Sequence, residues 1–481
     1  MVSTIAQLNL NTYGLLPEIL LLTMACLILI VDAYLPRNLR HLTYQLAQGT
    51  LIGTALLILA VAPEQRTLAM NSMFVADKMG TVLKFLIVLI VFVAFIYSRD
   101  YLRERKILKG EYFVLGLFAV LGMMIMVSAH SLLTIYLGLE LLSLSLYTMV
   151  AMHRESQQAS EAAMKYFVLG ALASGMLLYG MSILYGVTGT LDLTALAQAI
   201  SVDTEHGTIL AFGLVFIVIG LAFKLGAVPF HMWIPDVYQG APTAITLFIA
   251  SAPKIAAFAM LIRLLADGMQ SLHADWQGML ILLSILSMAV GNIIAIAQTN
   301  IKRMLAYSTI AHVGYLMLGI IAGTQAGYAA SMFYVIVYTL MTLGGFGMII
   351  LLSRTGFEAE QLNDFKGLNE RNPWYAALML ILMLSMAGVP PMLGFWAKWS
   401  VLAQVINAGL VWLAVVAVIF AIIGAFYYLR VIKLMYFDKP EYMTPIEARL
   451  DMRIALSANA LVILLLGLMP QTLMAVCLGA F

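Results

Sequence analysis

The chain has 481 residues, of which 63% are hydrophobic and only 10% are charged, and its formal net charge at pH 7 is +2. Soluble domains carry about 25% charged residues, so this composition excludes a water-soluble fold. The 2 cysteines, Cys26 and Cys477, stand near opposite ends of the chain. Iron–sulfur clusters and structural zinc sites need cysteines in groups. We therefore expect neither a redox cofactor nor a metal site in this chain.

Apolar runs of about 20 residues recur along the chain, and each is long enough to cross a ~30 Å hydrocarbon layer as a helix. Because the polar–apolar alternation of barrel strands is missing, we expect an all-α, polytopic membrane protein. Polar or Gly/Pro breaks separate fourteen predicted spans: 13–34, 42–62, 79–98, 112–129, 132–151, 163–187, 209–238, 242–265, 277–298, 303–323, 327–353, 374–405, 410–435 and 453–470.

The distribution of basic residues agrees with this number of spans. Most of the 26 lysines and arginines fall in loops that follow odd-numbered spans, whereas the loops of the opposite face hold only Arg66, Lys78 and Arg263. Lysine and arginine favour the cytoplasmic loops of membrane proteins. The pattern therefore predicts that both chain termini lie on the outer side.

Two predicted spans are too long and contain glycine and proline in their middle. The seventh reads KLGAVPFHMWIP over 224–235, and the twelfth reads MAGVPPMLG over 386–394. Such breaks free backbone groups, which membranes tolerate only inside protein or beside water. A simple proline kink is the alternative. The two breaks lie five helices apart, and since five is odd, units over spans 4–8 and 9–13 run in opposite directions, as in transporters with inverted repeats.

The sequence thus divides into four predicted parts. An N-terminal three-helix segment covers 1–111, the first inverted repeat covers 112–265, the second covers 277–435, and a C-terminal helix covers 436–481. In transporters of this design the functional groups lie at the broken helices, near the middle of the membrane.

Four charged residues fall in the middle of predicted spans: Glu140, Lys224, Lys254 and Lys398. Each costs roughly 2.5–3.5 kcal/mol at a helix centre. A structural ion pair between Glu140 and Lys224 is one explanation, but it leaves Lys254 and Lys398 without an acid. Burial disfavours a charged ammonium, so a buried lysine can both hold and release a proton. We interpret the four residues as a proton relay.

Further polar residues are secondary candidates for the relay. His231 follows Pro229 in the first break and His312 lies inside the tenth span; an imidazole titrates near neutral pH, although a buried histidine that only makes structural hydrogen bonds is the alternative for each.

Charges near the span ends have simpler explanations. Glu161 and Lys165 have the spacing of a surface ion pair, with a role of Glu161 in proton uptake as the alternative. Lys302 is interpreted mainly as a topology charge that could border a channel. Lys84 is expected to extend its ammonium to the membrane surface.

Three segments carry a resemblance to a known family. The sequences FKLGAVPFHMWIPDVYQGAPT over 223–243, KRMLAYSTIAHVGY over 302–315 and GVPPMLGFWAK over 388–398 are similar to motifs of the antiporter-like membrane subunits of respiratory complex I. The 236–243 ending, the lysine directly after Pro253, the lysine at 398 and the chain length distinguish this sequence from the L and M members. The resemblance covers all fourteen spans.

The resemblance implies a proton-translocating subunit of a bacterial NADH:quinone oxidoreductase in the inner membrane. It implies Glu140 and Lys224 as a coupled pair, Lys254 as the connecting lysine and Lys398 as the exit-side lysine. Flavin, iron–sulfur clusters and quinone would belong to partner subunits, with subunit M on one side and subunits A, J and K on the other. An Mrp-type monovalent cation/proton antiporter subunit is the alternative, and a structural spacer without a working channel is a third.

Overall fold

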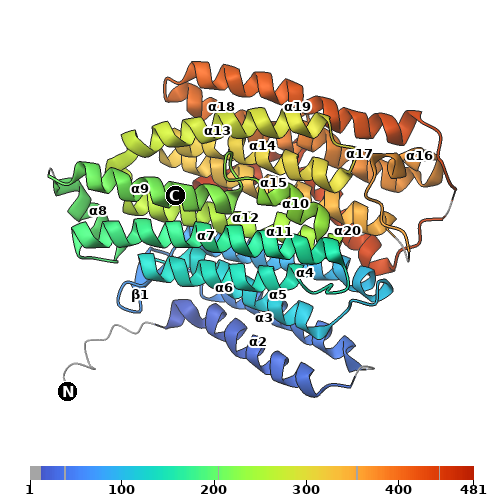
Figure 1. The fold of residues 1–481 in the computed structure, drawn as a ribbon, viewed down its shortest axis with the longest axis horizontal. Coiled ribbons are helices and arrows are strands. Elements are labelled where there is room, and N and C mark those ends of the chain that lie inside the picture. Colours follow the sequence, from blue (N-terminus) through green and yellow to red (C-terminus); the bar gives the residue numbers. More distant parts are fainter. Residues whose placement is uncertain (1–11, 37–38, 204, 354–355, 444) are drawn as a thin grey trace.

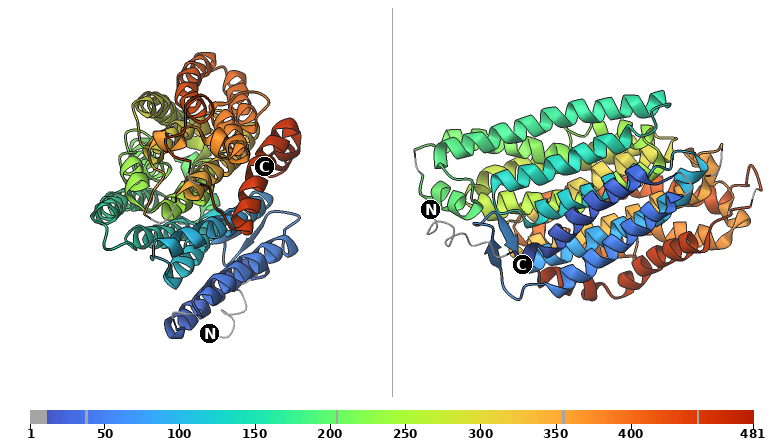
Figure 2. Two further views of the ribbon diagram at one scale, coloured as in Figure 1. Left: turned by 90° about the vertical axis from the view of Figure 1, so that its right-hand side faces the viewer. Right: turned by 90° about the horizontal axis from the view of Figure 1, so that it is seen from below.

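The computed structural model describes residues 12–36, 39–203, 205–353, 356–443 and 445–481. Long helices lie side by side in one bundle, with α2 (Leu16–Tyr34) and α3 (His41–Ala60) along one edge and α19 (Val411–Phe437) along the opposite edge (Figure 1). The start of the described chain and the C-terminus lie at the same end of the helices (Figure 2). An even number of membrane crossings places the two ends of a chain on the same side of the membrane. Of the predicted N-terminal segment, residues 1–11 lie outside the described residues.

The structure confirms the expected helical architecture, apart from one short pair of strands. Within the described residues, thirteen helices are long and apolar enough to cross a membrane. The prediction of fourteen exceeds this by one because the twelfth span consists of two shorter helices, α17 (Pro373–Ala387) and α18 (Leu393–Asn407). The other spans in the first half are α4 (Lys78–Glu104), α5 (Gly110–Ser128), α6 (Leu132–Val150), α7 (Gln157–Thr188) and α9 (Gly207–Leu225). Those in the second half are α13 (His273–Ile296), α14 (Ile301–Ile321), α15 (Gln325–Leu352) and α20 (Leu450–Leu468).

Small elements at the ends of the bundle are not predicted by the hydropathy pattern. They are the antiparallel strands β1 (Thr67–Ala69) and β2 (Phe74–Ala76), the helices α8 (Leu193–Val202), α16 (Leu368–Arg371) and α21 (Pro470–Leu478), and the 3₁₀ turns Tyr13–Leu15, Gln270–Leu272 and Leu362–Phe365. Each is too short to give a periodic signal of its own.

Several helices start at a polar residue. A side-chain oxygen accepts a hydrogen bond from the backbone N–H three residues further on, at Asp77, Ser156, Asp192, Asn300, Thr324 and Asn372. This satisfies one of the backbone donors that a helix leaves free at its start. These residues set the helix boundaries where hydropathy alone leaves them uncertain.

Both predicted breaks are present, and they have the same backbone geometry. Helix α9 ends at Gly226 with φ 84° and ψ 35°, and α17 ends at Gly388 with φ 84° and ψ 39°. Each glycine takes the left-handed conformation that side chains disfavour. Three residues later, Pro229 and Pro391 follow cis peptide bonds. The chain then resumes as α10 (Trp233–Gly240) or α18. The two halves of the chain therefore repeat this motif.

A third break corrects the prediction of a continuous eighth span. Residues 243–268 form α11 (Thr243–Ala250), α12 (Ala252–Leu261) and a π-helical segment, Ile262–Gly268. The helix is interrupted at Ser251, where ψ is −100°. Pro253 lacks the backbone N–H that a continuous helix would use. The break lies directly before Lys254, and residues 243–265 of this span are all buried within the bundle.

Helix α4 holds both ends of this eighth span. At one end, Arg263 forms ion pairs with the N-cap residue Asp77 at 2.7 Å and with Asp267 at 3.0 Å. At the other end, the backbone N–H of Thr243 donates to the Tyr101 hydroxyl at 3.0 Å. Arg263 was expected in a loop, but it is 2% exposed, because Asp77, distant in sequence, and Asp267, four residues further on, neutralise its charge.

Lys84 also differs from its prediction. Its ammonium does not reach the surface but forms an ion pair with Glu18 at 2.9 Å, and both side chains are buried. Glu18 lies on α2 and Lys84 on α4, so the pair ties the edge helix to the bundle. The sequence could not reveal this partner, because the two residues are 66 positions apart.

Candidate functional site

Glu140 and Lys224 lie near each other but do not form an ion pair within 4.0 Å. The Lys224 ammonium donates a hydrogen bond of 2.7 Å to the Ser143 hydroxyl. Ser143 stands one helical turn after Glu140 on α6. The Oε1 atom of Glu140 is buried and has no hydrogen-bond partner. The structure therefore has the serine, rather than the carboxylate, in direct contact with Lys224.

A small cavity joins Lys224 to Lys254. Its volume is about 30 Å³, and both lysines and Ser143 contribute to its wall, together with apolar residues and Trp233. A space of this size is enough to hold a water molecule. The first two lysines thus share a space that one water with several polar neighbours can fill.

Lys254 caps the end of the first broken helix. It is 3% exposed, and its ammonium donates a hydrogen bond of 2.8 Å to the carbonyl oxygen of Leu225, the last residue of α9. The Trp233 ring lies 5.4 Å away. A helix carries partial negative charge at its carboxyl end, which favours a cation there. Lys254 has no acid beside it, as the sequence suggested, but it does have a partner.

Lys398 has the same relation to the second broken helix. Its ammonium donates to the carbonyl oxygens of Ala387 at 2.9 Å and Met386 at 3.2 Å, at the end of α17. The Tyr315 ring lies 5.4 Å from the ammonium. A lysine therefore binds the freed carbonyl end of each broken helix, although Lys254 comes from the next span and Lys398 from the second half of the same span.

His312 lies in a buried network of tyrosines. Its Nδ1 is 2.7 Å from the Tyr334 hydroxyl, and its Nε2 is 3.0 Å from the Tyr428 hydroxyl. Tyr428 in turn contacts the Ser308 hydroxyl at 2.5 Å. The sequence analysis missed these tyrosines. An apolar span that carries several hydroxyls, such as α15 with Tyr334 and Tyr338, is the signal that could have indicated them.

His231 and Glu161 do not line the small cavity between Lys224 and Lys254. His231 lies in the linker before α10, and its buried Nδ1 atom has no hydrogen-bond partner. Glu161 is largely exposed and forms the predicted ion pair with Lys165 at 2.9 Å. Lys165 also pairs with Asp236 at 2.8 Å.

Lys302 has a structural role beyond setting the orientation of the chain in the membrane. It is 1% exposed, forms an ion pair with Glu360 at 3.0 Å and donates to the carbonyl oxygen of Ala241 at 2.8 Å. Ala241 is the cap of α10. Lys302 therefore holds the end of the short helix that follows the first break. Glu360 lies 58 positions away in the sequence, so this ion pair could not be predicted from local patterns.

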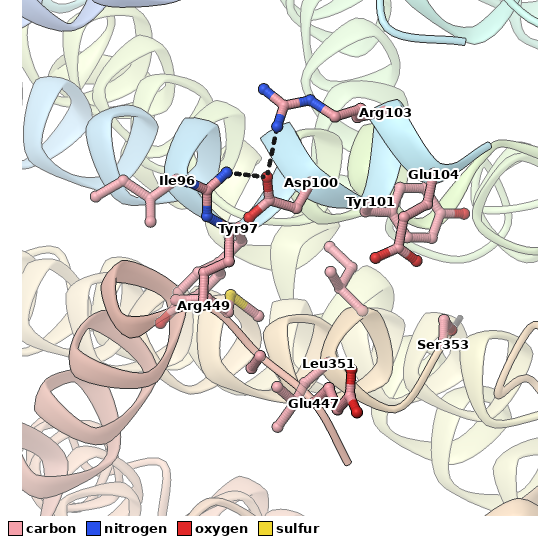
Figure 3. Close-up of a pocket in the computed structure, with 13 residues that line it drawn as sticks. Ile96, Tyr97, Asp100, Tyr101, Arg103, Glu104, Leu351, Ser353, Glu447 and Arg449 are labelled. Carbon is pink, nitrogen blue, oxygen red and sulfur yellow. Dashed lines mark hydrogen bonds and ion pairs between the residues drawn. The ribbon is translucent and has the colours of Figure 1, made fainter. Parts of the chain in front are cut away.

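A larger cavity opens at the face that carries the basic loops, which we call the basic face. It has a volume of about 430 Å³ and lies between α4, the end of α15 and the chain before α20. Asp100 accepts contacts there from Arg103 at 3.8 Å and Arg449 at 3.5 Å (Figure 3). None of the lysines of the broken helices lines it. Among the described residues, no group of three or more His, Cys, Asp or Glu side chains is arranged to hold a metal ion.

Comparisons with known proteins agree with this arrangement. Residues 129–424 match the family described as "NADH:quinone oxidoreductase/Mrp antiporter, TM". The chain is 59% identical to NADH-quinone oxidoreductase subunit N of Thioalkalivibrio sulfidiphilus, with 97% of each chain covered. It is 60% identical to subunit N of Thiobacillus denitrificans, with 97% of this chain and 96% of that one covered.

Solved structures share the fold. A chain of respiratory complex I from Thermus thermophilus has a TM-score of 0.83 and 31% identity, over 97% of this chain and all of that one. A chain of the Mrp complex from Dietzia sp. has a TM-score of 0.86 with 21% identity, over 98% and 96% of the two chains, which is a likeness of fold alone. The chain therefore belongs to the NADH:quinone oxidoreductase/Mrp antiporter family of membrane subunits.

Proposed function

We propose that this chain is a proton-translocating membrane subunit of an NADH:quinone oxidoreductase and that it performs no redox chemistry itself. The observation that carries the proposal is the pair of lysines at the carbonyl ends of two broken helices, the buried Lys254 on Leu225 and the partly buried Lys398 on Ala387 and Met386. The identity of about 60% to subunits N over nearly the whole chain supports the assignment to this complex.

Lys224 would take its proton in the first repeat under the control of Glu140. An opposite charge at about 4 Å and an effective dielectric constant of 20 stabilises an ammonium by about 4 kcal/mol. Since Glu140 does not reach Lys224 in this structure, a movement of α6 against α9 changes this stabilisation. A conformational signal from the partner subunits can therefore load or release the proton.

The proton would then pass to Lys254 across the small cavity and, through the second repeat, to Lys398. When Lys254 is neutral it no longer offers a full positive charge to the carbonyl end of α9. Loading and unloading are thereby coupled to the contact that spans the first break. The same holds for Lys398 and α17.

The chemistry of the path favours protons over sodium ions. Lysines line it, and an ammonium repels a metal cation, whereas sodium prefers carboxylate and carbonyl oxygens. We propose further that the chain resides in a bacterial inner membrane with its basic face in the cytoplasm and both termini outside. We expect subunit M on one side, subunits A, J and K on the other, and flavin and iron–sulfur clusters in partner subunits.

The experiment is purification through a tag on this chain, followed by reconstitution in liposomes. We expect a complex that contains flavin and iron–sulfur clusters and acidifies the vesicle lumen when NADH is added to sodium-free buffer. A tagged chain that isolates without such a complex would overturn the proposal.

The likeness to the Mrp complex chain keeps a cation/proton antiporter as the second candidate. The same liposomes separate the two functions. An antiporter would dissipate an imposed pH gradient when sodium is added, without NADH, and the proposed subunit would not.

A further inference from the structure

Ser143 presents a fixed hydrogen-bond acceptor to Lys224. The serine is 2% exposed, and its hydroxyl donates a hydrogen bond of 2.6 Å to the carbonyl oxygen of Leu139, one helical turn earlier on α6. A hydroxyl has one hydrogen and two lone pairs. Because the hydrogen is directed to Leu139, the oxygen accepts from the Lys224 ammonium, at 2.7 Å. The serine therefore holds the ammonium at one place.

A second partner for Lys224 lies one helical turn away. Glu140 precedes Ser143 by three residues on α6, and residues at this spacing lie on the same face of a helix. The charge of Glu140 acts on Lys224, but the buried Oε1 atom of Glu140 has no hydrogen-bond partner. A buried polar atom without a partner is unfavourable, and a lysine side chain is long and flexible. The ammonium can therefore exchange the serine for the carboxylate.

The two positions of the ammonium differ in what they face. Ser143 lines the small cavity that Lys254 also lines, whereas Glu140 does not. The two partners also differ in charge, because a carboxylate binds an ammonium more strongly than a neutral hydroxyl does and so opposes release of the proton. At Ser143 the ammonium is therefore next to the path toward Lys254 and is not paired with the group that retains its proton.

The hydrogen bond within α6 does not by itself explain Ser143. Serine hydroxyls in helices commonly donate to the carbonyl oxygen one turn earlier. Ser145 on the same helix is 5% exposed, and its hydroxyl donates in this way to Leu141 at 2.7 Å. Ser145 does not line the small cavity. The contact with Lys224 is thus the feature that distinguishes Ser143, and Ser145 is its matched control.

We propose that Ser143 is a positioning residue of the proton relay. It holds the Lys224 ammonium at the cavity shared with Lys254, in the state that releases the proton, and the ammonium moves to Glu140 in the state that retains the proton. The inference rests on the proposed function. Each proton that Lys224 passes on then requires one exchange between the two partners.

The test is Ser143→Ala in the full complex, with Ser145→Ala as the matched control. Each variant removes one buried hydroxyl from α6 and introduces a residue that favours helix, so both complexes should assemble in normal amounts. In Ser143→Ala the Lys224 ammonium loses its partner at the cavity, and electron cryomicroscopy of the complex should show an ion pair with Glu140. This complex should lose most of the protons pumped per NADH oxidised. Ser145→Ala should keep the normal ratio.

A second pair of variants separates the hydroxyl from the size of the side chain. Threonine and valine have the same shape and differ in the hydroxyl. Ser143→Thr keeps an acceptor for Lys224 and should pump at close to the wild-type ratio, whereas Ser143→Val should lose as much pumping as Ser143→Ala. This comparison decides the question even if Ser143→Ala assembles poorly.

Lys254→Arg tests the relay independently of the serine. A normal ratio in Ser143→Ala and Ser143→Val, or an equal loss in Ser145→Ala, together with a reduced ratio in Lys254→Arg, would overturn the role of Ser143 alone. A normal ratio in Ser143→Ala, Ser143→Val and Lys254→Arg would overturn the proposed function as well.

Discussion

The Lys254 ammonium lies 2.8 Å from the carbonyl oxygen of Leu225, the residue at which the first broken helix ends. The contact has two explanations. Lys254 can be a permanent cap that only stabilises the helix end, or it can be a cap that comes and goes with a proton. The protonated lysine makes the same contact in both cases, and the difference lies in whether the proton leaves.

Arginine distinguishes a permanent cap from a relay at Lys254 and Lys398. A guanidinium also donates to carbonyl oxygens and favours a helix carboxyl end, but it does not release its proton in a protein. We expect Lys254→Arg and Lys398→Arg to assemble in normal amounts and to lose most proton pumping, nearly as Lys→Ala does. The measurement is NADH-driven acidification of vesicles per amount of complex. Pumping near the wild-type rate would mean that both lysines are structural.

Glu140→Gln tests the control of Lys224. Glutamine has nearly the shape of glutamate but carries no negative charge that could stabilise the Lys224 ammonium. Because Glu140 makes no ion pair within 4.0 Å and its Oε1 atom has no partner, we expect normal assembly and a large loss of pumping. The amount of complex and the proton gradient are measured in the same vesicles. Poor assembly with normal pumping per complex would instead favour a structural role.

The buried pair of Glu18 and Lys84 gives the opposite expectation. Leaving one charge of such a pair alone costs roughly 3–5 kcal/mol, whereas replacing both by apolar residues is often neutral. Glu18→Leu or Lys84→Met alone should lower the melting temperature and the amount of complex. The double variant should recover both. A double variant as unstable as the single ones would show that the pair has another role.

Gly226→Ala tests the geometry of the first break. The residue has φ +84°, and an added Cβ would lie 1.8 Å from the Cδ1 atom of Ile234 on α10. Left-handed backbone alone costs an alanine roughly 1–2 kcal/mol. Gly189→Ala is the control, since φ is +67° and the space around it is open. We expect Gly189→Ala to be mild and Gly226→Ala to reduce stability and pumping strongly. Equal effects of the two variants would argue against tight packing of α10 on the break.

Local sequence patterns predicted the helix breaks, but interaction partners distant in sequence could not be predicted. Gly226 and Gly388 could be recognised because glycine and proline have the same consequence for backbone in any membrane helix. The partner of Lys84 could not be found, because Glu18 comes from another helix. The contact of Lys254 with the end of α9 could not be predicted either, because its partner is a backbone carbonyl, which every residue possesses. The break at Ser251 escaped because a single proline close to it also fits a kinked but continuous helix.

The attachment of α4 to both ends of the eighth span has a mechanical consequence. Asp77, at the start of α4, forms an ion pair with Arg263 at one end of the span, and Tyr101 of α4 accepts a hydrogen bond from Thr243 at the other end. Helix α4 therefore bridges the interruption at Ser251. While both contacts are present, α11 and α12 cannot tilt independently of each other. We therefore expect that a neighbouring protein that displaces α4 also moves Lys254 without contacting it.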